Sequence, residues 1–142
     1  MRISEIMTAG VKVVRPEDTI RRAAQLMDEL NIGSLPVCNG RKLVGIITDR
    51  DITVRATAAG RTPEETRVSE AMSEDLRWCY EDDDTAKVMD VMKDVQIRRI
   101  PVVDRDKNLV GIVALGDIAA RLDDEASGET LKEISTPAEP DR

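Results

Sequence analysis

Histidine and phenylalanine are both absent from this 142-residue sequence, and Trp78 and Tyr80 are its only aromatic residues. Histidine is the commonest general base and the commonest metal ligand among side chains, so sites of the Ser–His–Asp, Cys–His and histidine–zinc types are excluded. Without phenylalanine, the hydrophobic core has to be built from Val, Ile, Leu, Ala and the six methionines. The sequence therefore predicts an aliphatic core, and it indicates no metal site.

Cysteine is scarce as well, since only Cys38 and Cys79 are present. Two cysteines this far apart form no C-x-x-C motif and cannot complete a four-thiolate zinc site. Their apolar neighbours predict buried, unreactive thiols in a reducing compartment. A redox response that uses these two residues stays open as an alternative.

Long hydrophobic runs are also lacking. The longest run, residues 109–115, is far shorter than the roughly 20 residues that span a bilayer, and residues 1–7 show no apolar core of an export signal. We therefore expect a soluble, cytoplasmic protein without a membrane partner. Basic residues number 21 against 28 acidic ones, and the net charge of −7 argues against a nucleic-acid-binding face.

The sequence contains an internal duplication. Residues 2–7 (RISEIM) recur as residues 67–72 (RVSEAM), and residues 43–47 (LVGII) recur as residues 109–113 (LVGIV). A third block ends in Pro-Val at Pro36 and again at Pro101, 65 positions later. Three ordered blocks at nearly one spacing indicate two copies of the same structural unit.

Each copy is expected to have the order β-α-β-β-α after a short helical turn. The first helix of each copy needs an N-cap, which is Asp18 or Thr19 in copy one and Asp84 or Thr85 in copy two. The expected strands cover residues 11–14, 35–38 and 43–47 in copy one, and 76–80, 100–103 and 109–113 in copy two. The closing helix is expected at residues 49–59, with a shorter counterpart at residues 117–122.

The boundaries follow from this reading. Copy one covers residues 1–60, a linker covers 61–66, copy two covers 67–123, and residues 124–142 form an acidic, flexible tail in which residues 131–134 are the candidate for one helical turn. Three short strands with helices on one side leave a sheet face uncovered. We therefore expect an α/β (α+β) fold in which the two copies pack sheet to sheet as a pseudo-symmetric pair.

The block of residues 45–52 (GIITDRDI) carries the most chemical information. An apolar strand runs into the hydroxyl of Thr48, and Asp51 follows within the first turn of a helix, where unpaired N–H groups and the helix dipole favour an anion. A nucleotide fits such a junction, with phosphate on Thr48 and ribose on Asp51. The alternative is purely structural: Thr48 or Asp49 caps the helix, and Asp51 is a first-turn acid favoured by the dipole.

Two charged clusters are weaker candidates. Arg98 and Arg99 precede the strand at Ile100, where one guanidinium can clamp a phosphate; the alternative is pairing with surface carboxylates. The acidic run at residues 81–84 has no EF-hand spacing and is expected to form a solvated turn that ends in a helix cap.

Together these blocks resemble a tandem pair of CBS domains, a Bateman module, over residues 1–123. The residues that carry the resemblance are the repeated Ser-Glu-x-Met openings, the two Pro-Val strands, and residues 45–52 with their echo at residues 111–118 (GIVALGDI). The chain is also similar to stand-alone bacterial CBS-pair proteins of the hypoxic-response type. The resemblance implies a regulatory, non-enzymatic homodimer with no required cofactor.

The resemblance further implies binding of an adenosyl ligand, namely AMP, ADP, ATP, S-adenosylmethionine or NAD, in clefts between the copies. The family pattern maps onto Gly45, Thr48 and Asp51 in copy one, and onto Gly111, Ala114 and Asp117 in copy two, where the hydroxyl is missing. Its basic residue maps onto Arg99, and onto Ser34 in copy one. The expected nucleotide-binding residues are Thr48, Asp49, Asp51, Arg99, Leu35, Pro36, Val11, Asp117 and Pro101.

This asymmetry predicts one competent cleft, with Thr48, Asp51 and Arg99, and one degraded cleft, with Asp117 and Ser34. The alternative function is a structural or protein-binding module without a working nucleotide site. The expected protein partner of the module is a separate, regulated protein.

Overall fold

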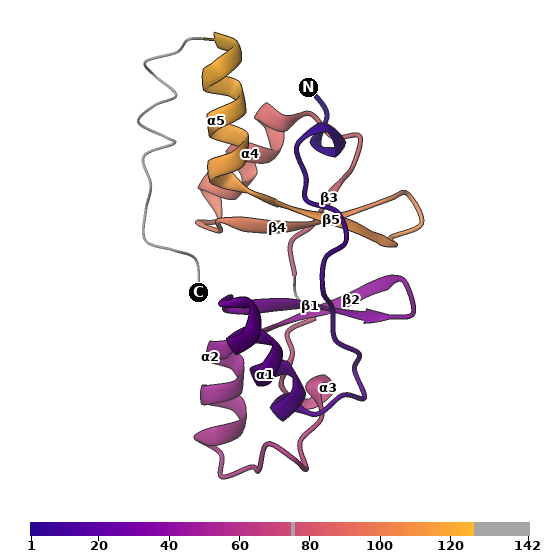
Figure 1. The fold of residues 1–142 in the computed structure, drawn as a ribbon, viewed down its shortest axis with the longest axis vertical. Helices are drawn as coiled ribbons and strands as arrows, with labels where there is room; N and C mark the ends of the chain where they lie inside the picture. Colours follow the sequence, from indigo (N-terminus) through magenta and orange to yellow (C-terminus); the bar gives the residue numbers. More distant parts are fainter. Residues whose placement is uncertain (75, 127–142) are drawn as a thin grey trace. The chain divides into compact units, whose positions relative to one another are not determined.

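The computed structural model describes residues 1–74 and 76–126. The chain divides into two compact units. One unit, here called the first-repeat unit, consists of Lys12–Leu76; the other, the second-repeat unit, joins Met1–Val11 to the chain from Arg77 onward. Each is a small sheet covered by helices (Figure 1), which confirms the predicted mixed α/β class.

The first-repeat unit is built on a β-hairpin. Strands β1 (Ser34–Asn39) and β2 (Lys42–Thr48) pair antiparallel through a turn at Gly40, whose φ of +63° suits glycine. The expected strand at residues 11–14 is reduced to a single parallel bridge between Val14 and Val37. The helical elements of the unit are α1 (Ile20–Leu30), α2 (Asp49–Asp51), η2 (Ile52–Thr57) and α3 (Val68–Ala71).

Helix α1 begins where the sequence offers a cap. Of the two candidates, Thr19 is the N-cap, because its hydroxyl accepts a hydrogen bond from the Arg22 N–H. Ile20, Ala23, Leu26 and Met27 form its buried stripe. The helix ends at Leu30 and is followed by the C-cap residue Asn31, which has a left-handed φ of 54°.

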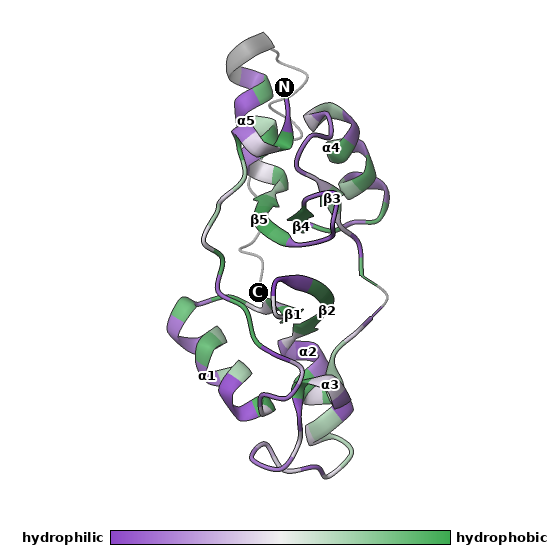
Figure 2. Cartoon of the chain, turned by 90° about the vertical axis from the view of Figure 1, so that its right-hand side faces the viewer, coloured by the Kyte–Doolittle hydropathy of each residue, from purple (hydrophilic) through white to green (hydrophobic). Residues whose placement is uncertain are grey.

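The second-repeat unit repeats this plan with a three-stranded sheet of order β3-β4-β5. Strand β3 (Cys79–Tyr80) runs parallel to β4 (Arg99–Val103), which pairs antiparallel with β5 (Leu109–Ala114). The expected strand at 76–80 is thus shorter than predicted. Helix α4 (Thr85–Asp94) has Asp84 as its N-cap, although the Asp84 side chain makes no capping hydrogen bond. Strands β4 and β5 are strongly hydrophobic (Figure 2).

Two closing helices differ from their predicted form. The expected helix at 49–59 is a single α-turn, α2, followed by the π-helix η2, which ends at Thr57; the Ala58 N–H bonds to the Thr53 carbonyl. The counterpart predicted as shorter is longer: α5 spans Leu115–Ala126. The helix starts two residues before Asp117 and extends into the segment predicted as tail. Ile118 and Ala119 are its buried residues in the core of the unit. The turn predicted at residues 131–134 lies outside the described residues.

The two repeats exchange their opening turns. The 3-10 turn η1 (Ile3–Glu5) belongs to the second-repeat unit, where Ile3 is fully buried and Thr8 and Ile112 exchange two backbone hydrogen bonds of 2.8 and 2.9 Å. Helix α3 occupies the same position in the first-repeat unit, where Ile46 and Ser73 exchange bonds of 3.0 and 2.8 Å. The predicted linker at 61–66 belongs to the first-repeat unit, where the Thr66 carbonyl accepts a hydrogen bond from the Ile20 N–H.

A glycine in each hairpin makes room for the exchanged segment. A Cβ atom on Gly45 would lie 2.9 Å from both the sulfur of Met72 and the carbonyl oxygen of Ser73. A Cβ atom on Gly111 would lie 2.8 Å from the equivalent atoms of Met7 and Thr8. The repeated glycines are therefore required by the close approach of the crossing chain.

The cores are aliphatic, as predicted from the missing phenylalanine. Each unit has its own cluster, one around Leu35, Val37 and Ile47, the other around Met92, Ile100 and Ile118. Each cluster includes a residue from the exchanged turn, Val68 in the first-repeat unit and Ile3 in the second.

Candidate functional site

The junction between β2 and α2 is a reciprocal cap. The Thr48 hydroxyl oxygen accepts a hydrogen bond of 3.0 Å from the Asp51 N–H, and Oδ2 of Asp51 accepts one of 3.0 Å from the Thr48 N–H. Of the two candidate caps, Thr48 is therefore the one in place. The cap leaves each side chain with spare capacity: the Thr48 hydroxyl still has a proton to donate, and Oδ1 of Asp51 can still accept.

Arg55 fixes this carboxylate from the next turn. Its Nε lies 3.8 Å from Oδ1 of Asp51, and its Nη1 donates to the Met72 carbonyl at 3.1 Å. The Asp51 side chain is only 16% exposed, so it is held in one orientation rather than freely solvated. Sequence reasoning missed Arg55, although an acidic and a basic residue four positions apart on a helix are a recognised pairing signal.

The other predicted residues of copy one lie close by in the chain but differ in exposure. Asp49 is exposed, and its backbone N–H bonds to the Gly33 carbonyl at 2.9 Å. Leu35 is fully buried in the core and Pro36 is buried beside it. Ser34 lies directly across the hairpin from Thr48. The contacts of these residues with a ligand stay predictions.

The remaining predicted residues belong to the second-repeat unit. Arg99 is the exposed first residue of β4, directly across from Ala114. Pro101 is buried in the same strand, and Val11 ends the N-terminal segment of the unit. Asp117 lies exposed in the first turn of α5. Because Ala114 has no hydroxyl, the reciprocal cap seen at Thr48 cannot form here.

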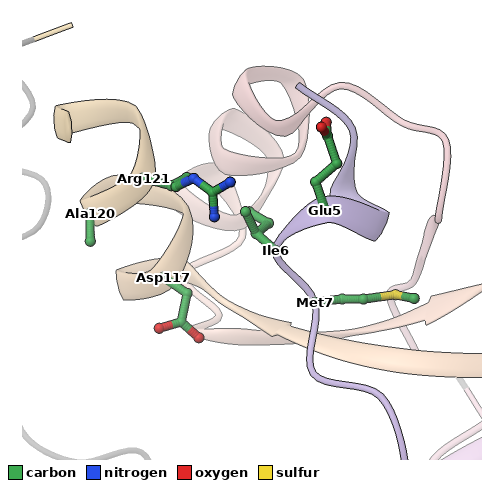
Figure 3. Close-up of a pocket in the computed structure, with 6 residues that line it drawn as sticks. All are labelled: Glu5, Ile6, Met7, Asp117, Ala120 and Arg121. Carbon is green, nitrogen blue, oxygen red and sulfur yellow. The ribbon is translucent and has the colours of Figure 1, made fainter. Parts of the chain in front are cut away.

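A hollow that is open to solvent lies in each unit. The hollow of the first-repeat unit has a volume of about 260 Å³ and lies between α1 and the start of η2; it is lined by Ala24, Met27, Asp28, Ile32, Asp49, Ile52 and Thr53. The hollow of the second-repeat unit, about 330 Å³, lies between the N-terminal turn and α5 (Figure 3); it is lined by Glu5, Ile6, Met7, Asp117, Ala120 and Arg121.

The acidic run at 81–84 forms the predicted turn. Oδ2 of Asp83 accepts a hydrogen bond from the Tyr80 N–H at 2.9 Å, and Asp84 occupies the N-cap position of α4 without a capping hydrogen bond from its side chain. Both carboxylate oxygens of Asp82 accept from Arg105 at 2.8 and 3.0 Å, and this partner lowers the pKa of Asp82. Within residues 1–74 and 76–126, no group of three or more His, Cys, Asp or Glu side chains is placed to hold a metal ion.

Burial keeps the thiols of Cys38 and Cys79 in their protonated form. It raises the pKa of Cys38 to about 11 and that of Cys79 to about 12, with the negative charge of Asp83 adding to the second. Both side chains are buried. The thiolate is the reactive form of cysteine, and a raised pKa leaves little thiolate at neutral pH. This environment therefore agrees with the prediction that both thiols are buried and unreactive.

Thiol modification checks this directly. At pH 8 in the native protein, we expect both cysteines to react with a chromogenic disulfide at least about 100-fold more slowly than in urea, because each unit of pKa lowers the thiolate fraction tenfold. The native rate should rise as the pH approaches 11. Rapid native labelling of Cys38 or Cys79 at pH 8 would restore the redox alternative.

In the described part of the chain, no helix has the length and apolar character needed to cross a membrane.

The model of the CBS domain family matches this chain twice, at residues 3–56 and 68–124. The sequence is 43% identical over 134 residues to the CBS domain-containing protein YhcV of Bacillus subtilis, covering 94% of both chains. It is 37% identical over 134 residues to hypoxic response protein 1 of Mycobacterium tuberculosis, covering 94% of this chain and 93% of that one.

Solved structures agree with these matches. A crystal structure of hypoxic response protein I with two coordinated zinc ions gives a TM-score of 0.76 at 36% identity, covering 84% of this chain and 98% of that one. The CBS domain pair of MJ0100, in complex with 5′-methylthioadenosine and S-adenosyl-L-methionine, gives 0.71 at 28% identity, covering 88% and 98%. The duplicated sequence, the repeated fold and these matches all lead to one conclusion: the chain belongs to the CBS domain family and contains a tandem pair of these domains.

Proposed function

We propose that this chain is a non-enzymatic regulatory module that binds an adenosyl ligand at the Thr48–Asp51 junction. The observation that carries the proposal is the reciprocal cap, which holds the Thr48 hydroxyl group and the Asp51 carboxylate in place at a helix start. A ligand phosphate can accept from the Thr48 hydroxyl, and ribose hydroxyls can donate to Asp51. Support comes from MJ0100, a solved relative at 28% identity that holds two adenosyl compounds.

Arg99 supplies the proposed phosphate clamp from the second repeat. A charge-assisted hydrogen bond of this kind contributes about 1.5–3 kcal/mol, which is roughly tenfold to hundredfold in affinity. We propose that AMP, ADP, ATP, S-adenosylmethionine and NAD are the ligands to compare. The alternative, a structural or protein-binding module, requires the same cap but no ligand.

Two matched pairs of variants separate ligand binding from capping. Thr48→Ala and Thr19→Ala each remove a threonine N-cap of the first-repeat unit, and each should cost about 1 kcal/mol of stability. Asp51→Asn and Asp18→Asn each alter a carboxylate that accepts a backbone N–H three residues earlier. Only the Thr48 and Asp51 variants should lose affinity, by about tenfold or more, in calorimetric titrations with each adenosyl compound.

Arg99→Ala belongs in the same titrations, with Arg98→Ala as its neighbouring control. A loss confined to the Arg99 variant, and to ligands that carry phosphate, is the expected result. Equal affinities in Thr48→Ala and Thr19→Ala would reduce the junction to a helix cap, and the absence of heat from every adenosyl compound would favour the structural module.

The proposed module acts as a homodimer on a separate protein in the cytoplasm. Three large apolar side chains on helical elements support self-association, because they are well exposed: Leu30 on α1, Val54 on η2 and Val91 on α4 are 40%, 50% and 42% accessible.

A further inference from the structure

Two methionines lie where an exchanged opening turn meets a hairpin, a contact here called a crossing. A Cβ atom on Gly45 would lie 2.9 Å from the Met72 sulfur, and one on Gly111 would lie 2.8 Å from the Met7 sulfur. Figure 3 shows the Met7 side chain in an extended form, and its sulfur lies beside β5, the strand that contains Gly111. Each thioether therefore packs directly on the backbone of a strand.

These two thioethers are also the most accessible ones among the methionines that follow Met1. Met7 and Met72 are half-buried, and Met7 lines the open hollow of the second-repeat unit. The other three are at most 5% exposed, namely Met27, Met89 and Met92. Because oxidation requires access to the sulfur, a small oxidant in solution reaches Met7 and Met72 before the three buried methionines.

The crossings are poor surroundings for an oxygen atom on either sulfur. The Cβ position of Gly45 is also 2.9 Å from the Ser73 carbonyl oxygen, which accepts the Ile46 N–H at 3.0 Å. The Thr8 carbonyl and the Ile112 N–H have the same arrangement in the second-repeat unit, at 2.9 Å. A sulfoxide is polar, and a polar oxygen buried without a hydrogen-bond donor is unfavourable. The oxidised turn is therefore expected to move away from its strand.

In the first-repeat unit, the crossing is also connected to the Thr48–Asp51 junction. The Met72 carbonyl accepts a hydrogen bond of 3.1 Å from Nη1 of Arg55, and Nε of Arg55 lies 3.8 Å from Oδ1 of Asp51. A displaced Met72 would remove one of the contacts that orient Arg55. Oxidation at this crossing would thereby weaken the hold of Arg55 on the Asp51 carboxylate.

We propose that Met7 and Met72 are modification sites for peroxide, and that their sulfoxides release the opening turns from the hairpins. The sulfur lone pair attacks one peroxide oxygen and the O–O bond breaks. The second oxygen leaves as water after taking the proton of the first, so sulfur loses the two electrons that peroxide gains. Methionine sulfoxide reductases, one for each epimer, return the thioether. The proposal does not depend on ligand binding.

Limiting hydrogen peroxide tests the selectivity. Peptide mass mapping of the native full chain should show that Met7 and Met72 gain one oxygen atom at least about tenfold faster than the three buried methionines. In urea, all five should react at similar rates. Equal rates in the native chain would overturn the proposal.

Leucine variants separate the two crossings, because leucine keeps an apolar side chain of similar volume without the sulfur. After oxidation of the unsubstituted chain, hydrogen exchange at the amides of Ile46 and Ser73 should be at least about tenfold faster, and the Arg55 Nε–H signal should shift in NMR spectra. Met72→Leu should abolish these effects. Met7→Leu should leave them in place and protect only the crossing of the second-repeat unit.

Reversal and mimicry complete the test. Treatment of the oxidised chain with both sulfoxide reductases and a thiol should restore slow exchange. Met72→Gln, whose amide imitates the polar sulfoxide, should give fast exchange at Ile46 and Ser73 without peroxide. Sulfoxides at Met7 and Met72 that leave exchange at both crossings unchanged would overturn the proposal, and so would fast exchange at Ser73 in oxidised Met72→Leu.

Discussion

Ile3→Ala should destabilise the second-repeat unit by about 2–5 kcal/mol, the usual cost of truncating a buried isoleucine. Ile3 is fully buried in the core cluster of Val88, Met92 and Ile118. Ile3 belongs to the first copy in the sequence, yet it packs in the core of the second-repeat unit. Trp78 lies in the same unit, so urea unfolding followed by tryptophan fluorescence reports on the unit that loses the contact.

Leu30→Ala is the control for this experiment, because Leu30 is 40% exposed on α1 and its truncation should change the free energy by less than about 1 kcal/mol. If Ile3→Ala were as mild as Leu30→Ala, the exchange of opening turns between the repeats would be wrong.

Gly45→Val should destabilise the first-repeat unit by about 3 kcal/mol or more. Its Cβ would lie 2.9 Å from a backbone carbonyl oxygen, that of Ser73, and backbone cannot move aside as a flexible side chain can. Overpacking costs about 1–3 kcal/mol. If the segment at Ser73 moved away from β2, the two hydrogen bonds between Ile46 and Ser73 would also weaken, and these contribute about 0.5–1.5 kcal/mol each. Thermal unfolding followed by circular dichroism measures the effect.

Gly116→Ala provides the matched control. Gly116 lies in α5, and a Cβ atom added to it would have no neighbour within 4 Å, so alanine should raise stability by up to about 1 kcal/mol through helix propensity. A wild-type melting temperature in Gly45→Val would show that the crossing segment does not approach β2 as described.

The local elements could be read from the sequence because their signals are local. The Pro36 and Pro101 strands and the cap at Thr19 each depend on a few adjacent residues, and the structure has them at the expected positions. The duplication also predicted that whatever forms in one copy has a counterpart in the other.

The exchange of opening turns could not be read in the same way. Residues 2–7 and 67–72 are nearly identical in pattern, so neither motif says which hairpin it contacts; that choice is made by tertiary packing. The predicted start of the last helix at Asp117 is two residues too late because no capping residue precedes Leu115, and the π-helix after Asp51 has i→i+5 bonds that no local motif specifies.

The candidate site was only partly predictable for a similar reason. Thr48 and Asp51 stood out by residue type and spacing, but Arg55 acts through a carbonyl 17 residues away. The role of Arg55 depends on this tertiary contact, which no local motif specifies.

The most direct test of the adenosyl-binding account is an NMR titration of the ¹⁵N-labelled chain with AMP and with S-adenosylmethionine. We predict saturable shifts that are largest at the amides of residues 48–51 for at least one of the two ligands. Saturable shifts that leave residues 48–51 unmoved, or no shift with either compound at millimolar concentration, would contradict it.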